Sequence, residues 1–225
     1  MDLDFDLAAW MPQLLDGLIV TLEITALCIA IGIVLGLLLA MGRIYGRHIV
    51  YGFCSVYVSF FRGTPILVQV FLVYYGLPKI GISFDGFTAG VLAFGLNTAA
   101  YQAEYFRGSI QSLPAGQMMA ARSVGMTPWQ SLRHIVLPQA LRLVIPPWSN
   151  ELILMLKYSS IIFLATVRDL MGEARIIASD TFRYFEVFII VALMYLAIVL
   201  MITWGLRWFE GRIRVPGLGG GGAGS

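Results

Sequence analysis

Residues Gly116 to Pro138 read GQMMAARSVGMTPWQSLRHIVLP, and they separate two strongly apolar parts of the chain. The first half of this stretch contains good helix formers. Met118, Ala121 and either Val124 or Gly125 recur there with the spacing of one helix face. The apolar run is too short to cross a bilayer. We therefore predict a helix that lies at a membrane surface, in a position where a partner protein could bind it.

The second half of the stretch has the residue types that end one helix and begin another. Gly125 can adopt the left-handed backbone conformation that ends helices. Thr127 is a good N-cap, and Pro128 is favoured at the first helical position. The stretch therefore predicts a short helix, a glycine hinge and a second helix.

Composition indicates a chain that resides in lipid. The 225 residues are 59% hydrophobic and 12% charged, and the mean hydropathy is +0.82. Soluble domains are about 45–50% apolar and about 25% charged. The net charge of +2 is too small to indicate nucleic-acid binding. The N-terminus has acids where a secretory signal would have bases, so we expect no signal peptide.

Five apolar runs are close to the length that crosses roughly 30 Å of hydrocarbon, which predicts an all-α integral membrane protein. The second run is interrupted by Arg62-Gly63-Thr64-Pro65, where the proline disfavours helix. The first contains Gly32-x-x-x-Gly36, which permits close helix packing. We expect loops at 42–52 and 77–85, a charged outer helix within 167–185, and a flexible glycine-rich tail over 215–225. The predicted transmembrane domain covers 1–214, with spans at about 18–41, 53–75, 87–106, 143–165 and 186–206 and a loop at 107–142.

Five spans place the two termini on opposite sides, and the basic residues predict the orientation. With the N-terminus outside, the outer segments hold four of the fifteen Lys and Arg residues, and two fall inside spans. The excess of basic residues marks the cytoplasmic side, which predicts an outer N-terminus, a cytoplasmic C-terminus and a cytoplasmic loop 107–142. The nine cytoplasmic residues are Arg43, Arg47, Arg107, Arg122, Arg133, Arg142, Arg207, Arg212 and Arg214.

Several polar residues fall inside the predicted spans, where each costs at least about 2.5–3.5 kcal/mol unless it is paired or hydrated. They allow two interpretations: a polar cavity between the second, third and fourth spans that accepts a zwitterion, or a buried ionic network with side chains that reach the interface. On the third span, Asn97, Tyr101 and Glu104 share one helix face. The candidates are Asn97, Tyr101, Glu104, Asn150, Glu151, Lys157 and, at the break of the second span, Arg62.

The sequence offers little chemistry of its own. Its two lysines, Lys79 and Lys157, lie outside any phosphate-binding loop pattern, so ATP would have to be hydrolysed by another chain. His48 and His134 are far apart, and Cys28 and Cys54 have no metal-binding spacing. We therefore expect no catalytic or metal-binding residues and no cofactor bound by this chain.

The cytoplasmic loop matches a family motif. Permease subunits of bacterial and archaeal ATP-binding-cassette (ABC) importers share Glu-Ala-Ala, three residues, Gly, nine residues and Ile-x-Leu-Pro. This chain has Met119-Ala120-Ala121, then Gly125, then Ile135-Val136-Leu137-Pro138 with the same spacing. Over about residues 10–214 it resembles the polar amino acid uptake group, to which segments 62–69 (RGTPILVQ) and 100–108 (AYQAEYFRG) are also similar. It departs from the pattern at Met119, where the family has Glu, and at Tyr158, where an acid is frequent.

The resemblance implies a type I ABC importer permease in a prokaryotic inner membrane. It implies alternating-access translocation of a polar amino acid, two ATPase subunits that bind ATP and Mg, a second permease, same or related, and an extracytoplasmic solute-binding protein. A channel or an exporter subunit remains the alternative on physical grounds. The resemblance also implies a coupling helix that docks on the ATPase, with Gln117, Met119, Ala120, Ala121, Gly125 and Pro138 as coupling residues.

Overall fold

The computed structural model describes residues 7–213, apart from the side chains of Ala115 and Ile213, and this part of the chain contains helices but no strands. The acids Asp2, Asp4 and Asp6, Arg214 and the glycine-rich tail 215–225 lie outside the described residues. The α-helices are α1 (Leu7–Tyr45), α2 (His48–Gly63), α3 (Ile66–Phe71), α4 (Gly86–Gln111), α5 (Ala115–Ser123), α6 (Pro128–Ser131), α7 (Leu137–Tyr158), α8 (Leu170–Thr181) and α9 (Tyr184–Ile213). The short π and 3-10 segments are η1 (Leu72–Gly76), η2 (Leu77–Ile80), η3 (Leu132–Val136) and η4 (Ser159–Ala165).

Within residues 7–213, α1 and α9 are each long and apolar enough to cross a membrane. The number rises to four if each of two bent helix pairs forms one span. The first pair joins His48–Gly63 to Ile66–Ile80 at 104°, and the second joins Pro128–Ala165 to Leu170–Thr181 at 52°. The all-helical membrane fold is confirmed, whereas the five-span arrangement and its limits stay predictions.

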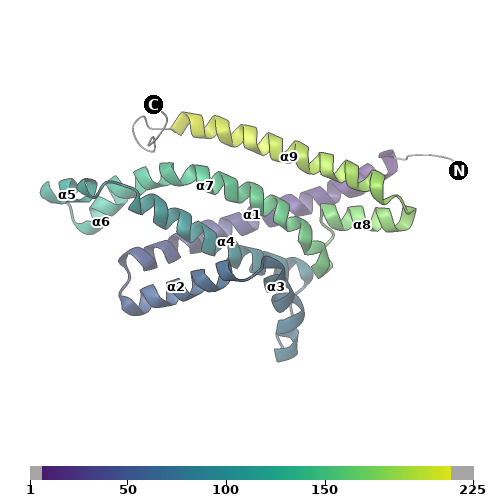
Figure 1. The fold of residues 1–225 in the computed structure, drawn as a ribbon, viewed down its shortest axis with the longest axis horizontal. Coiled ribbons are helices and arrows are strands. Elements are labelled where there is room, and N and C mark those ends of the chain that lie inside the picture. Colours follow the sequence, from purple (N-terminus) through teal and green to yellow (C-terminus); the bar gives the residue numbers. More distant parts are fainter. Residues whose placement is uncertain (1–6, 214–225) are drawn as a thin grey trace.

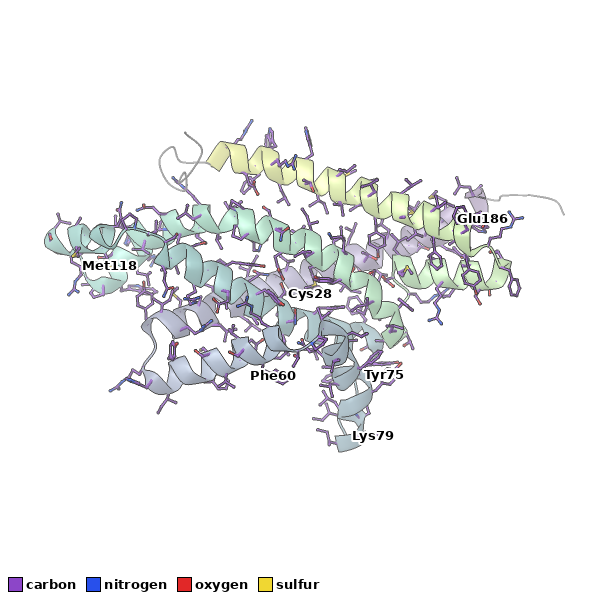
Figure 2. All side chains as sticks on the ribbon, in the orientation of Figure 1. Cys28, Phe60, Tyr75, Lys79, Met118 and Glu186 are labelled. Atoms are coloured by element: carbon purple, nitrogen blue, oxygen red, sulfur yellow. The ribbon has the colours of Figure 1, made fainter. Side chains whose placement is uncertain are left out.

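Figure 1 shows α1, α4, α7 and α9 running along the long axis of the molecule. The α5–α6 element lies at one end, and α8 lies at the other end with the start of α1. The labelled side chains of Met118 and Glu186 mark these two ends in Figure 2. The surface element predicted to be cytoplasmic and the helix predicted to be outside thus lie at opposite ends of the bundle.

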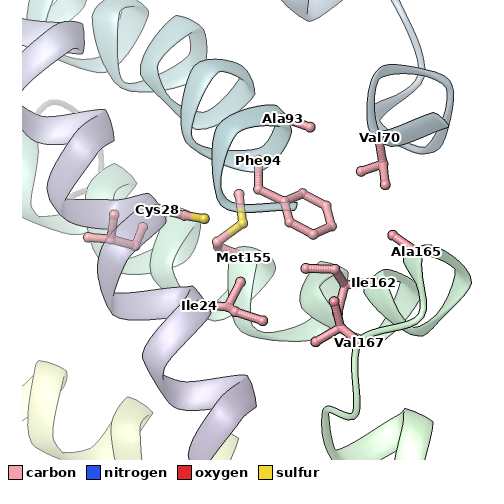
Figure 3. Packing of buried hydrophobic residues seen from close by; sticks show 10 residues of the cluster. Ile24, Cys28, Val70, Ala93, Phe94, Met155, Ile162, Ala165 and Val167 are labelled. Atoms are coloured by element: carbon pink, nitrogen blue, oxygen red, sulfur yellow. The ribbon is translucent and has the colours of Figure 1, made fainter. Parts of the chain in front are cut away.

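The main core joins segments that are far apart in the sequence. Phe94 of α4 is fully buried between Ile24 of α1, Met155 of α7 and Ile162 of η4 (Figure 3). Val70 of α3 belongs to the same cluster. Burial of each such side chain contributes roughly 1.5–3 kcal/mol in water, although in lipid close packing replaces this driving force.

The predicted close approach of the first span is confirmed in the contact between α1 and α4. A Cβ atom at Gly32 would lie 2.2 Å from Nε2 of Gln102, and one at Gly36 would lie 2.9 Å from the Gln102 Cβ. A side chain at Gly36 would require a shift of α4, because backbone atoms of Ala99 and Ala103 lie within 3.1 Å, whereas one at Gly32 would displace the end of the Gln102 side chain. These two glycines therefore allow α1 to contact the polar helix α4 directly.

The predicted break in the second span is confirmed. Helix α2 ends at Gly63, and Thr64 adopts an extended conformation with φ −113° and ψ 143° before Pro65. The chain then turns through 104° into an arm (residues 66–80) whose tip carries Lys79 (Figure 2). The arm is fastened to η4, because Tyr75 donates to the Leu164 carbonyl at 3.0 Å.

The first loop is shorter than predicted. The loop expected over 42–52 is reduced to Gly46 and Arg47, because α1 continues to Tyr45 and α2 begins at His48. Gly42 permits this tight hairpin, since a Cβ atom there would meet the Cys54 sulfur at 2.6 Å. In the fourth predicted span, Pro146 and Pro147 lie inside α7.

Candidate substrate pathway and coupling element

Helix α4 carries two polar stripes, each with the spacing i, i+4, i+7. The first stripe is Asn97, Tyr101 and Glu104, as predicted, and its contacts reach the end of α2. The second stripe is Thr98, Gln102 and Tyr105, displaced by one residue. Because one residue rotates a helix by about 100°, the second stripe meets α1 and α7 instead.

Asn97, the first residue of stripe one, forms hydrogen bonds at the break in the second span. The Asn97 amide donates to the Phe61 carbonyl at 2.9 Å and to Oε1 of Gln69 at 3.1 Å. The Gln69 amide in turn donates to the Phe61 and Thr64 carbonyls. Backbone carbonyls released by a helix break need such partners inside a membrane. Asn97 therefore stabilises the break through hydrogen bonds.

The remaining residues of stripe one form an ionic cluster around Glu104. Its carboxylate pairs with Arg43 of α1 and, at 2.6 Å, with Arg107 of α4. Arg62 approaches the same carboxylate at 3.7 Å, and its guanidinium lies 5.1 Å from the centre of the Tyr101 ring. Glu104 thus has the ionic network that one interpretation expected. The Arg62 side chain is 43% exposed, against 15% for Glu104, and remains accessible.

Stripe two holds the carboxylate of Glu151, which is only 5% exposed. Thr98 donates to its Oε1 at 2.8 Å, and Tyr105 donates to its Oε2 at 3.1 Å. Tyr105, which binds Glu151, directly follows Glu104, the ion-pair partner of Arg62, in α4. The structure therefore brings Arg62, Tyr101, Glu104 and Glu151 into one polar region between α2, α4 and α7.

Two predicted residues lie apart from this region. Asn150 and Lys157 are seven residues apart on α7 and share an exposed face, whereas Glu151 points to α4. No side-chain partner of Lys157 occurs within residues 7–213. The i to i+7 spacing explains the shared face. Their role in the pathway stays a prediction.

Sequence reasoning missed five residues that complete the region. Thr98, Gln102 and Tyr105 could have been found, because they repeat the spacing of stripe one. Gln69 stands out less, since its function depends on carbonyls that only the bend exposes. Arg43 was assigned to a loop, but α1 extends far enough to place it beside Glu104.

The surface element has the predicted local structure. Helix α5 ends at Ser123, and Gly125 has φ +87°, in the left-handed region. Thr127 caps α6 in a capping box with Gln130, and Pro128 follows at its start. The expectation that Val124 shares the apolar face of this helix was wrong. Val124 is 79% exposed, because α5 ends at Ser123 and Val124 lies after its last turn.

The inner side of this element is packed against the bundle. Ala121 is 6% exposed, and Met118 packs on a cluster that contains Leu132 and Val136. The Gln139 amide donates to Oε1 of Gln117 at 3.4 Å, which joins α5 to the start of α7. Side-chain contacts thus join α5 to η3 and to the start of α7.

The connection to α7 is also continuous along the backbone. Segments α6, η3 and α7 follow one another without a gap, and η3 is a π turn that ends two residues before Pro138. Proline has no N–H for the usual helical bond, and π turns accommodate such irregularities. On the other side, only Ser112–Pro114 separate α4 from α5. The element is thus joined directly to both helices that hold Glu151.

The outer side of the element presents apolar and basic side chains. Met119 is 63% exposed, and Trp129 is 66% exposed. Ala120 and Pro138 are exposed as well. No Asp or Glu occurs between Arg107 and Arg142. This surface suits a partner that offers apolar contacts and carboxylates.

A helical membrane bundle with a hinged surface element joined to its polar helices defines the membrane component of a transport system. Residues 32–215 match the family model described as "Binding-protein-dependent transport system inner membrane component". The chain belongs to this family of inner-membrane permeases, and the resemblance inferred from the sequence is confirmed. Its role is transport, and permeases of this family generally work with ATPase and binding-protein partners.

Relatives align along most of the chain. It is 39% identical over 217 residues to the probable amino-acid ABC transporter permease protein PatM of Vibrio harveyi, with 95% of this chain and 97% of PatM covered. It is 40% identical over 199 residues to the probable glutamine permease GlnM of Bacillus subtilis, covering 88% and 92%. It is 35% identical over 218 residues to the glutamine permease GlnP of Escherichia coli K12, covering 95% and 100%.

Solved structures agree with the fold. A chain from a crystal structure of an amino acid ABC transporter with histidines has a TM-score of 0.88 and 40% identity, covering 94% of this chain and 100% of that one. A chain of the inward-facing methionine transporter MetNI has a TM-score of 0.75 and 22% identity, covering 91% and 98%. The second likeness concerns the fold alone.

Proposed function

We propose that this chain is the permease of an ATP-driven importer that carries a polar amino acid across the inner membrane by alternating access. Two separate ATPase subunits bind ATP and Mg and supply the energy, and a solute-binding protein delivers the substrate. A second permease, the same chain or a related one, completes the pathway. The relatives PatM, GlnM and GlnP, named for amino-acid or glutamine transport, support this substrate class.

The observation that carries the proposal is the position of opposite charges between α2, α4 and α7. Arg62 offers an accessible guanidinium next to Tyr101, and Glu151 offers a buried carboxylate. A free amino acid has both a carboxylate and an ammonium group. Charge-assisted hydrogen bonds to these groups are about twice as strong as neutral ones. Arg62 therefore binds the carboxylate, and Glu151 binds the ammonium group.

Coupling to the ATPase follows from the connections of the α5–α6 element. The element joins α4 directly to η3 and α7, and these helices carry the Thr98–Glu151 contact. When the ATPase subunits close, they displace the element, and the displacement shifts α4 against α7. The polar region then opens to one side of the membrane at a time.

Docking on the ATPase uses packing where other members of the family have a carboxylate. Met119 occupies the position of the family Glu and is exposed, as is Val124. Arg122 and Arg133 are also exposed. The ATPase groove is therefore apolar opposite Met119 and carries carboxylates opposite the arginines.

The test is a substrate screen on the assembled transporter in proteoliposomes. Each amino acid is added with the binding protein, and the ATPase rate and uptake are measured. At least one polar amino acid should stimulate both, and Arg62→Gln should weaken the response while assembly is retained. A complex that hydrolyses ATP but responds to no amino acid would refute the assignment of the substrate class.

A further inference from the structure

A cavity of about 320 Å³ lies at the end of the molecule opposite the coupling element, between η4 and α8. This volume is at the lower end of the range of small-molecule sites, about 300–1,000 Å³. Phe163 and Ile176 form apolar parts of the cavity lining, and Ser179 adds a hydroxyl group. The cavity therefore has the size and the mixed lining of a site for a small polar molecule.

Two arginines line the cavity, but only one is neutralised. Arg168 forms a two-point ion pair with the buried Glu173, with distances of 2.8 and 3.2 Å. Arg175 instead lies over the Phe163 ring at 5.3 Å, and it has no carboxylate partner among the described residues. The cavity consequently holds one positioned guanidinium that is free to bind an anion.

An acidic residue lies on the same wall. Asp180 lines the cavity and forms no ion pair within residues 7–213. It follows Arg175 by five residues on α8, about 7.5 Å along the helix axis. Five residues also correspond to a rotation of about 140° around the helix, so the two side chains leave α8 in different directions and both reach the cavity lining. A guanidinium and a carboxylate around one small cavity match the two charged groups of an α-amino acid.

We propose that this cavity is an outer binding site for α-amino acids, in which Arg175 binds the carboxylate and Asp180 the ammonium group. It deepens the proposed function and rests on it for one point, namely that substrate arrives at this end of the molecule. The site is separate from Arg62 and Glu151. It recognises main-chain groups, so it accepts amino acids with different side chains.

The experiment uses Ser179→Cys in the complete transporter in intact cells, labelled from outside with a membrane-impermeant maleimide. The native thiols, Cys28 and Cys54, are both buried. Labelling of the parent chain, which lacks the added cysteine, measures their background reaction. The probes are L-alanine, L-alaninamide, which lacks the carboxylate, and N-acetyl-L-alanine, which lacks the ammonium group. Ile176→Cys, at another exposed wall position, is a second reporter.

Millimolar L-alanine should slow labelling at either reporter, and each analogue should protect about tenfold less well, the usual loss for one charge-assisted hydrogen bond. Adding Arg175→Gln should abolish the protection, whereas adding Arg62→Gln should leave it intact. Labelling that L-alanine does not slow, or protection that survives Arg175→Gln, would overturn the outer site. Because this readout needs no ATP, its failure leaves the proposed transport function standing.

Discussion

The Thr98 hydroxyl of α4 donates a hydrogen bond of 2.8 Å to the Glu151 carboxylate of α7, and both residues are buried. The bond joins the two helices that flank the coupling element. It also holds an acid in the region where we place the substrate. Any relative movement of α4 and α7 therefore changes the surroundings of this carboxylate.

Glu151→Gln should raise the KM for amino acid uptake about tenfold or more, because the ammonium group loses a charged partner. Gln still accepts a hydrogen bond from Thr98 or Tyr105, so the protein should remain folded. The measurement is uptake in proteoliposomes containing the whole transporter. Glu23→Gln, on an exposed position of α1, is the matched control. Unchanged affinity and transport would remove Glu151 from the substrate pathway.

Gly125→Asp should leave the protein inserted but reduce uptake and the stimulation of ATP hydrolysis. Gly125 has φ +87°, and this conformation costs other residues roughly 1–2 kcal/mol. Gly116→Asp adds the same charge nearby, where no left-handed backbone is required, and should have little effect. Gly125→Asn should retain more activity, because Asn tolerates this conformation as Asp does but adds no charge. Normal uptake in Gly125→Asp would contradict the hinge.

Gly32→Ala should destabilise the fold by about 1–3 kcal/mol, the usual penalty for overpacking. The new methyl group would meet the Gln102 side chain at 2.2 Å and the Thr98 side chain at 2.9 Å, where α1 packs on α4. Gly52→Ala is the control, since nothing lies within 4 Å of that position. The control should be neutral or slightly stabilising, because Ala favours helix. Thermal unfolding in detergent measures both, and equal midpoints would contradict the close packing.

Asp169, the N-cap of α8, provides a pH-dependent test of stability. Burial raises the pKa of this carboxyl from 3.8 to about 7. Between these values the folded state binds a proton that the unfolded state has released, so stability falls as pH rises from about 4 to 7. The full difference is on the order of 4 kcal/mol, at 1.36 kcal/mol per pH unit.

Asp169→Asn should flatten this pH dependence, since Asn also caps helices well. Unfolding midpoints are compared between pH 4 and 8, with the exposed Asp16→Asn as the control. A slope that persists in Asp169→Asn would show that another group carries the pH dependence.

The sequence was most informative where structure is determined locally. The turn at Gly125, the cap at Thr127 and the break before Pro65 all depend on residue types whose backbone preferences are strong. The face shared by Asn97, Tyr101 and Glu104 follows from helix geometry alone. Membrane composition likewise made the fold class evident.

Tertiary partners could not be predicted in this way. Whether Glu104 faced a cavity or arginines depended on how far α1 extends to bring Arg43 close. The separation of Asn150 from Glu151 depended on which side of α7 meets α4. The outer cavity depended on how η4 packs on α8.

The most direct measurement of the central claim is uptake in sealed proteoliposomes that contain the permease with or without its ATPase subunits. We expect concentrative uptake of an amino acid only when the ATPase, ATP and the binding protein are all present. Accumulation against a gradient by the permease alone would contradict the account.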